Sequence, residues 1–243
     1  VEAPGIASRE EAPRAIVERE LTPFGDATTD RLGNLILHRQ GSGPRVMLAA
    51  HLDEIGFIVR YVDDDGFVFV QPLGGFDPRM INAQRVLVTT EGGAIPGTLN
   101  YGTKPKHLLT PDEEKAAQKM EAFFVDTGLG KGAKEAVRLG DMVTMDRPLT
   151  EMGDLIVGKA MDDRVSVFAM IEAIRTAEEV TADLYAVATV QEEIGLRGAA
   201  AAGSAIAPEI VIALDVTLAN DIPGVPKSEW TTQLGKGTAI KIM

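Results

Sequence analysis

The 243-residue sequence contains no cysteine, and this absence excludes disulfide bonds and metal sites built on thiolates. Any metal ion must therefore be held by oxygen atoms and imidazole nitrogens, and the sequence has only three histidines. It also lacks a run of about 18 apolar residues, so we expect no membrane span. No charged-then-apolar leader stands at its start, and we expect a cytoplasmic protein.

Positive charge is scarce: 24 lysines and arginines face 36 aspartates and glutamates, which gives a net charge of −12. A broad basic face for nucleic acid is therefore not expected. The G-x-S-x-G motif of serine hydrolases and the phosphate-binding G-x-x-x-x-G-K-[ST] motif are also absent. With 45% hydrophobic residues, the chain can form one large domain, or a medium domain that carries an insert.

The apolar patterns divide the chain into a discontinuous domain and an insert. Residues 1–66 and 155–243 alternate buried strands with helices, which predicts an α/β catalytic domain with a mostly parallel sheet. Residues 67–154 carry short β-like runs between stretches rich in glycine and proline, which predicts an inserted β-barrel domain. Within this insert, Thr110–Glu113 has the composition of a capped helix start.

Four stretches, each at the end of an apolar run, hold the chemistry-bearing residues. They are A-H-L-D-E-I-G at 50–56, G-K-A-M-D-D-R at 158–164, Q-E-E-I-G at 191–195 and A-L-D-V-T at 213–217. Sites on open α/β sheets gather at the carboxyl ends of the strands. One histidine, a pair of aspartates, a pair of glutamates and a single aspartate are what two neighbouring divalent metals need, with a carboxylate as bridge. Together the four stretches predict a two-metal site.

Taken singly, the first two stretches also have readings without a metal. His51 and Asp53 are compatible with an ordinary strand-to-loop junction, although Asp53 is placed to hydrogen-bond the imidazole and fix its tautomer. Asp162 and Asp163 suit a helix N-terminus on their own, because the helix dipole favours negative charge there. In the metal reading, one of the two aspartates bridges both ions.

The last two stretches are open to the same question. Adjacent strand residues point to opposite faces, so Glu192 and Glu193 reach one site only if the strand stops there. One of them could then bind a metal while the other moves protons, and the alternative is a solvated turn. Asp215 ends a buried strand, where a carboxylate needs partners, and its alternative role is that of a cap or turn residue.

Seven motifs in order make the sequence similar to the tetrahedral (TET) aminopeptidase family, which includes glutamyl aminopeptidases and relatives once labelled endoglucanases. The motifs span almost the whole chain: A-H-L-D-E-I-G-F, Q-P-L-G-G-F-D-P-R, K-P-K-H-L-L-T-P, G-K-A-M-D-D-R, Q-E-E-I-G-L-R-G-A, L-D-V-T-L-A-N-D-I-P-G and L-G-K-G-T-A-I-K-I-M. Amidohydrolases and deacetylases of N-acyl amino acids share the H-x-D and E-E elements but usually not the D-D-R and D-V-T forms. They stay the alternative enzyme class.

The resemblance implies a dinuclear metallo-aminopeptidase with two divalent ions per subunit, zinc or cobalt in the first place and manganese as a further option. It assigns Asp162 as the residue that bridges both ions. His51 and Asp215 would complete the shell of one ion, and Glu193 would bind the other.

The same resemblance implies the remaining roles, the fold and the partners. Glu192 would be the general base, and Asp53 would orient His51. The fold would be an α/β metallopeptidase domain with an inserted β-barrel that resembles a PDZ module. Peptides would be the substrates, and subunits would assemble into homo-oligomers, from dimers to twelve-subunit tetrahedral particles.

The sequence departs from the family pattern at its C-terminal end. The family's second metal takes a further histidine on a segment that follows the stretch ending here at Met243, and no histidine follows His107. We therefore expect that the C-terminal part of the catalytic domain is not included. If the chain did end there, the second ion would have only Asp162 and Glu193, and the protein would be a catalytically impaired assembly subunit.

Overall fold

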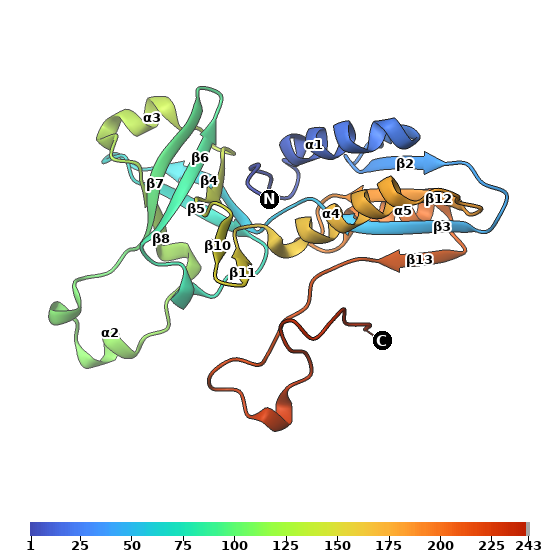
Figure 1. Ribbon diagram of the computed structural model, residues 1–243. Helices are drawn as coiled ribbons and strands as arrows, with labels where there is room; N and C mark the ends of the chain where they lie inside the picture. Colours follow the sequence, from blue (N-terminus) through green and yellow to red (C-terminus); the bar gives the residue numbers. More distant parts are fainter. Residues whose placement is uncertain (242–243) are drawn as a thin grey trace.

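The computed structural model describes residues 1–241, with a helix-flanked sheet on one side and a barrel on the other (Figure 1). The sheet has five strands in the order β1-β2-β12-β3-β13. Their bounds are β1 (Asp26–Thr29), β2 (Leu35–Arg39), β3 (Arg45–His51), β12 (Asp183–Thr189) and β13 (Ile210–Ala213). Strands β12 and β13 run parallel to β3, so their carboxyl ends meet at one edge.

The sheet is mixed, and the prediction of a mostly parallel sheet is wrong at its β1–β2 end. Strand β2 pairs antiparallel with both β1 and β12. The cause is local: β1 and β2 form a hairpin, and antiparallel strands need only a short turn, whereas a parallel neighbour needs a crossover. The predicted ligands follow the three strands that run parallel to one another, β3, β12 and β13.

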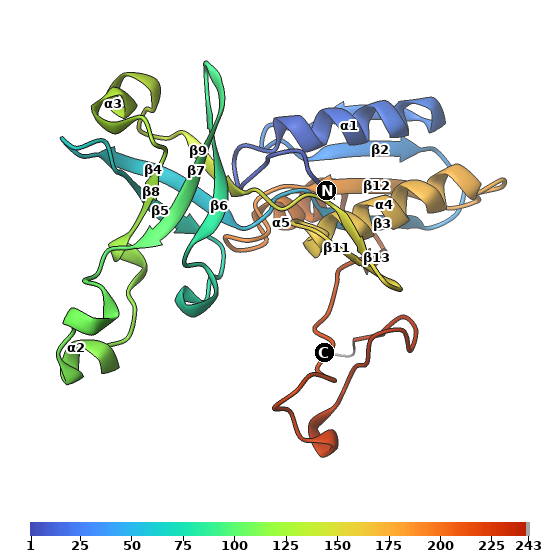
Figure 2. The ribbon, with the colours of Figure 1, turned by 60° about the vertical axis from the view of Figure 1, so that its left-hand side comes forward.

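Helices cover both faces of the sheet (Figures 1 and 2). Helices α1 (Glu11–Leu21) and α4 (Met161–Thr176) pack on one face, and α5 (Arg197–Ile206) packs on the other. The buried apolar side chains of α4 recur at helical spacing and face the strands; they are Val167, Met170, Ile171 and Ile174. Each fully buried side chain of this size stabilises the fold by about 1.5–3 kcal/mol, which fixes the start of α4 beside the sheet edge.

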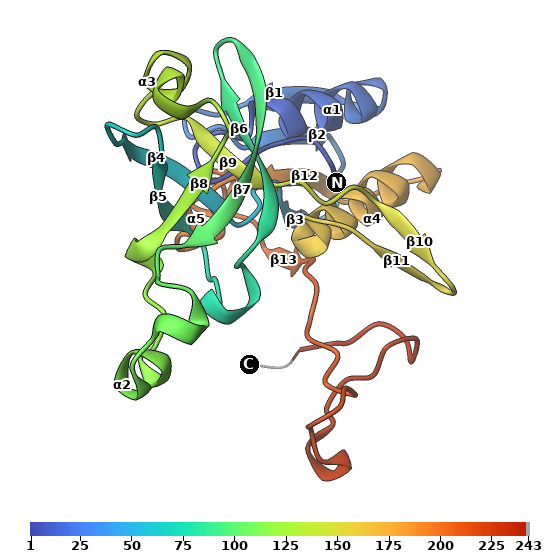
Figure 3. The same cartoon turned by 90° about the vertical axis from the view of Figure 1, so that its left-hand side faces the viewer.

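Six strands close into the barrel in the order β4-β5-β8-β7-β6-β9 (Figure 3). Their bounds are β4 (Gly56–Val62), β5 (Val68–Leu73), β6 (Gln84–Thr90), β7 (Gly93–Tyr101), β8 (Phe123–Asp126) and β9 (Met142–Met145). Alternate side chains such as Val86 and Val88 fill the interior, as the two-residue period of a strand requires.

The predicted boundary at residues 66 and 67 falls inside this barrel, because β4 is one of its strands. The sequence of β4 gives no sign of this. It is an apolar run directly after β3, and the pattern alone does not show that the chain leaves the sheet between Leu52 and Ile55.

The other elements are short and mostly exposed. Helix α2 (Pro111–Lys115) lies on an excursion from the barrel, and its predicted capping box between Thr110 and Glu113 is confirmed. Helix α3 (Ala133–Ala136) and the hairpin of β10 (Thr150–Met152) and β11 (Leu155–Val157) complete the set, with 3-10 turns at Thr22–Phe24, Pro78–Met80, Lys106–Leu108, Met120–Ala122, Gly130–Gly132 and Lys227–Glu229. Among residues 1–241, no helix has the length and apolar character that a membrane crossing requires.

Candidate metal centre

The predicted ligands converge at the carboxyl ends of β3, β12 and β13. His51 is the last residue of β3, Glu192 and Glu193 follow β12, Asp215 follows β13, and Asp162 lies in the first turn of α4. Their ligand atoms form two groups, each within 4.8 Å: His51 with Glu192 and Glu193, and His51 with Asp162 and Asp215. The structure thus brings the four carboxylates together around one buried imidazole. Which ion each would bind stays a prediction.

The imidazole of His51 is only 3% exposed and is held from both sides. Its Nε2 lies 3.0 Å from Oδ1 of Asp162 and 3.7 Å from Oε2 of Glu192. Its Nδ1 lies 3.0 Å from the backbone carbonyl of Asp53. When Nδ1 carries the proton, it donates to this carbonyl and leaves Nε2 free to bind a metal among the carboxylates.

The charges of the centre perturb its titrating groups in a consistent way. Burial lowers the pKa of His51, but hydrogen bonds with Asp162 and Asp53 and the surrounding negative charges raise it to about 11. Burial, together with the charge of Asp162, raises the pKa of Glu193 to about 7. These shifts show that several carboxylates share a small volume with one imidazole. Divalent cations neutralise such a cluster, and carboxylate oxygens with imidazole nitrogen form a suitable ligand set. The residues present therefore fit divalent metal ions.

The two adjacent aspartates at the start of α4 have different environments. The side chain of Asp162 is 60% exposed and faces His51. Asp163 is fully buried, and its Oδ2 accepts a hydrogen bond of 3.0 Å from the backbone N–H of His51. Burial raises the pKa of Asp163 to about 7. Asp162 is the one of the two aspartates that lies in a candidate ligand group, whereas Asp163 ties α4 to the end of β3.

Asp53 contacts more of the centre than the sequence predicts. Its carboxylate is fully buried, and Oδ1 lies 3.5 Å from Nδ1 of His51. The same carboxylate accepts hydrogen bonds from the backbone N–H groups of Glu192 and Glu193, at 3.0 and 3.1 Å. Asp53 therefore links the histidine ligand to the turn that carries the glutamates.

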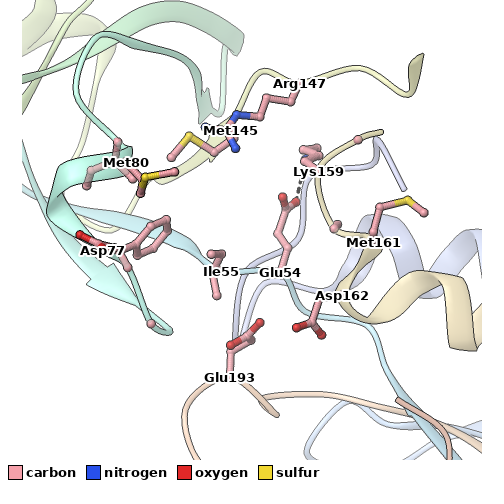
Figure 4. Close-up of a pocket in the computed structure, with 15 residues that line it drawn as sticks. Glu54, Ile55, Asp77, Met80, Met145, Arg147, Lys159, Met161, Asp162 and Glu193 are labelled. Carbon is pink, nitrogen blue, oxygen red and sulfur yellow. Dashed lines mark hydrogen bonds and ion pairs between the residues drawn. The ribbon is translucent and has the colours of Figure 1, made fainter. Parts of the chain in front are cut away.

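A cavity of about 530 Å³ adjoins the centre at the junction of the sheet and the barrel. Figure 4 shows Asp77 and Met80 of the barrel on one side of this cavity, and Asp162 and Glu193 on the other. Small-molecule sites commonly have volumes of about 300–1,000 Å³. The cavity is thus large enough for a small ligand, and the barrel contributes one of its walls.

Comparison with known proteins now identifies the family. The model of the M42 glutamyl aminopeptidase family matches residues 33–243. The chain belongs to this family. Aminopeptidases are among the proteins that it resembles, and metal-dependent hydrolysis is consistent with the family.

Three M42 relatives illustrate the similarity. A lysyl aminopeptidase from Pyrococcus furiosus is 37% identical over 252 residues, which cover 100% of this chain and 71% of the relative. The structure of an aminopeptidase from the archaeon Desulfurococcus kamchatkensis matches with a TM-score of 0.89 and 38% identity, covering 96% of this chain and 65% of that chain. The TET1 peptidase of Pyrococcus horikoshii, described as assembling into a tetrahedron or a large octahedral shell, matches with a TM-score of 0.80 and 30% identity, covering 91% and 69%. The chain spans about two thirds of the length of these relatives.

This M42 chain also has a buried ionic cluster beside the centre, which sequence reasoning missed. The Nζ atom of Lys159 lies 2.7 Å from Oε1 of Glu54, and Nη2 of Arg164 lies 3.5 Å from the same oxygen (Figure 4 shows the first pair). Burial raises the pKa of Glu54 and lowers that of Lys159, and each charge partly offsets the other's shift. Lys159 and Arg164 flank the aspartates in G-K-A-M-D-D-R, and this spacing is the sequence feature that could have indicated the ionic cluster. They anchor the Asp162 segment to the residues after β3.

The other two histidines lie outside the centre. His38 pairs with Asp183 through a contact of 2.7 Å and stacks on Tyr185, at the opposite end of β12. His107 lies in the exposed 3-10 turn before α2. Within residues 1–241, both candidate ligand groups contain His51 and neither contains His38 or His107.

Proposed function

We propose that the protein is an aminopeptidase that uses two divalent ions to remove N-terminal residues from peptides. The observation that carries this proposal is the pair of ligand groups that overlap at His51, at the sheet edge of an M42 family member. In this assignment Asp162 would be shared by both ions, His51 and Asp215 would help to hold one of them, and Glu193 would help to hold the other. Zinc, cobalt and manganese all suit oxygen and imidazole ligands.

Glu192 is the proposed general base. When bound, the ions supply a nucleophilic water of lowered pKa and polarise the scissile carbonyl. The Glu192 side chain is 26% exposed and reaches the centre beside Nε2 of His51. Burial raises the pKa of Glu192, which makes this carboxylate a stronger base for taking a proton and returning it to the leaving amine. The hydrogen bond of its backbone N–H to Asp53 holds this carboxylate in place.

The cavity beside the centre is the proposed binding space for part of the peptide. Its barrel wall combines the apolar side chains of Phe76, Met80 and Met145 with the charged groups of Asp77 and Arg147. The ring of Phe76 stacks on the ring of Phe57 in β4, with 4.4 Å between the ring centroids, and this contact joins the cavity wall to the barrel core. In this proposal the barrel takes part in substrate binding, and the division of the chain into a discontinuous catalytic domain and an inserted barrel has a functional meaning.

A homo-oligomer, from a dimer up to a twelve-subunit particle, is the proposed assembly. Its support is the similarity to the TET1 peptidase of Pyrococcus horikoshii, which can assemble into a tetrahedron or a large octahedral shell. Sedimentation velocity on the purified protein tests this part of the proposal, and a monomer at micromolar concentration would refute it.

The decisive experiment compares Glu192→Gln with Asp162→Asn in the metal-loaded protein. Glu192→Gln should keep the metal content and lower kcat at least about a hundredfold, since a positioned general base contributes about 10²–10⁴. Asp162→Asn should lose both metals, because each ion shares this carboxylate. The exposed Glu178→Gln is the matched control and should leave kcat unchanged.

The substrate panel for this experiment pairs free-amine peptides with their N-acetylated forms and with N-acyl amino acids. Hydrolysis of the free-amine peptides alone supports the aminopeptidase assignment, because that activity requires a free α-amine. Hydrolysis of the N-acyl substrates alone would assign the amidohydrolase class instead. Near-normal turnover in Glu192→Gln would contradict the role of Glu192.

A further inference from the structure

The turn after β12 presents two adjacent glutamates to one centre. Neighbouring residues of an extended strand point to opposite faces, so Glu192 and Glu193 require a backbone that departs from the strand. Gln191, directly before them, has a φ of +56°. Few residues other than glycine adopt this left-handed conformation, which is unfavourable unless the surroundings hold it. Contacts from outside the turn add to its own backbone hydrogen bonds in holding this conformation.

Three buried side chains supply these contacts through four successive backbone N–H groups. Val190 donates to Oδ1 of Asn34 at 3.0 Å, and Gln191 donates to Oε1 of Glu10 at 3.0 Å. The next two N–H groups, at 192 and 193, donate to the two carboxylate oxygens of Asp53. None of the three acceptors belongs to the turn, since between 139 and 181 residues separate each donor from its acceptor.

Glu10 holds the residue with the unusual backbone. It lies directly before α1, is only 3% exposed and does not cap that helix with its side chain. The same Oε1 atom also accepts the backbone N–H of Ser8 at 2.9 Å. Burying a carboxylate is unfavourable unless hydrogen bonds compensate, and burial raises the pKa of Glu10. Its two N–H partners are the compensation, and one of them is Gln191 of the glutamate turn.

We propose that Glu10 is a positioning residue for the metal centre: by accepting the N–H of Gln191, it fixes the turn in which Glu192 and Glu193 face the same site. The inference rests on the proposed aminopeptidase function and extends it to the N-terminal segment. Without this acceptor, the N–H of a buried residue loses its partner. The Gln191 backbone then relaxes from its left-handed conformation and turns the following carboxylates away from the ions.

The test uses the metal-loaded protein with Glu10→Ala and Glu10→Gln. Glu10→Ala should lower kcat about 10–100-fold, the usual effect of removing a group that orients metal ligands. It should also change the visible absorption spectrum of the cobalt-loaded protein. Glu10→Gln should keep at least half of kcat and the wild-type spectrum, because its amide oxygen accepts the same N–H group. Should Glu10→Ala fail to fold, Glu10→Asp retracts the acceptor by one methylene and is read in the same way.

Val17→Ala is the matched control for stability. Val17 is 5% exposed and lies in α1, where it packs in the helix–sheet core, away from the turn. It should lower Tm while leaving the kcat and the cobalt spectrum of the folded protein unchanged. A wild-type kcat and spectrum in Glu10→Ala would overturn the proposal. The proposal would also be overturned if Val17→Ala, with the same decrease in Tm as Glu10→Ala, showed the same loss of kcat and the same change of spectrum.

The two readouts separate this proposal from the proposed function. If the wild-type protein binds cobalt but cleaves no peptide, and Glu10→Ala still alters the spectrum, the positioning role stands and the aminopeptidase assignment fails. If the wild-type protein cleaves peptides and Glu10→Ala matches it, the positioning role fails alone. A wild-type protein that binds none of zinc, cobalt and manganese overturns both.

Discussion

Gly74 lies where the barrel approaches the candidate metal centre, and Gly74→Ala tests how closely the two are packed. Gly74 follows β5 and has a φ of +91°. A Cβ atom at this position would lie 2.4 Å from Cγ2 of Ile55 and 3.2 Å from Oε2 of Glu193. The backbone conformation and the available space therefore both require glycine here.

The expected magnitude combines these two effects. A residue with a Cβ atom in a left-handed conformation costs about 1–2 kcal/mol, and an extra methyl group in a packed site costs about 1–3 kcal/mol. We expect Gly74→Ala to lower the free energy of unfolding by about 2–5 kcal/mol. At ~2–4 °C per kcal/mol for a chain of this size, Tm falls by ~4–20 °C. Displacement of Glu193 should also weaken the binding of one metal ion.

The assay is thermal unfolding followed by circular dichroism, with zinc content measured on the same samples. The neighbouring Gly75→Ala is the control, since its Cβ atom meets nothing within 4 Å. An exposed substitution of this kind changes stability by no more than about 0.5 kcal/mol. Equal Tm and zinc content in the two variants would refute the close contact between Gly74, Ile55 and Glu193.

Two further predictions concern the buried charges. Lys159→Met should lower the free energy of unfolding, measured in urea, by about 3 kcal/mol, because it leaves the buried carboxylate of Glu54 with only the more distant cation of Arg164. Adding Glu54→Gln to this variant should restore part of the lost stability. An equal loss of stability in the single and the double variant would contradict this coupling. Metal binding should release about one proton per chain at pH 7.5, because His51, with its pKa raised to about 11, is protonated without metal and must become neutral to bind one. Titration calorimetry with zinc in two buffers of different ionisation enthalpy measures this proton release. The affinity for zinc should also rise with pH. Binding of zinc without proton release would contradict the assignment of His51 as a ligand.

The convergence of the ligands could be predicted from the sequence because it depends on strand ends. His51, Glu192 and Asp215 each follow an apolar run, and the three runs become β3, β12 and β13. Parallel strands align their carboxyl ends, so ligand-bearing residues there meet whatever the length of chain between them. The order of strands was not needed for this inference, and the mixed character of the rest of the sheet did not affect it.

The groups that hold the ligands could not be predicted in the same way. Glu10 stands in the charged stretch S-R-E-E, which reads as an exposed helix start. Its burial results from a contact with Gln191, 181 residues away, and no local pattern encodes that distance. The left-handed backbone conformation of Gln191 could not be predicted from the sequence either, because glutamine has no preference for this conformation. Side-chain types identify ligands, whereas their acceptors depend on tertiary packing.

The N-terminal segment contacts three of the four segments that carry predicted ligands, and it does so mainly through backbone groups. The Gly5 N–H donates to Glu54 after β3, the Gly5 carbonyl accepts from Arg164 of α4, and Glu10 accepts from Gln191 after β12. Because Glu10 and Asp53 bind the N–H groups of the glutamate turn, the carboxylates of that turn remain free for ions and protons. Hydrogen bonds to the carboxylates of Glu192 and Glu193 would also fix the turn, but they would occupy the oxygen atoms that bind ions and move protons. Hydrogen bonds to the backbone therefore keep the turn rigid and leave these carboxylates available.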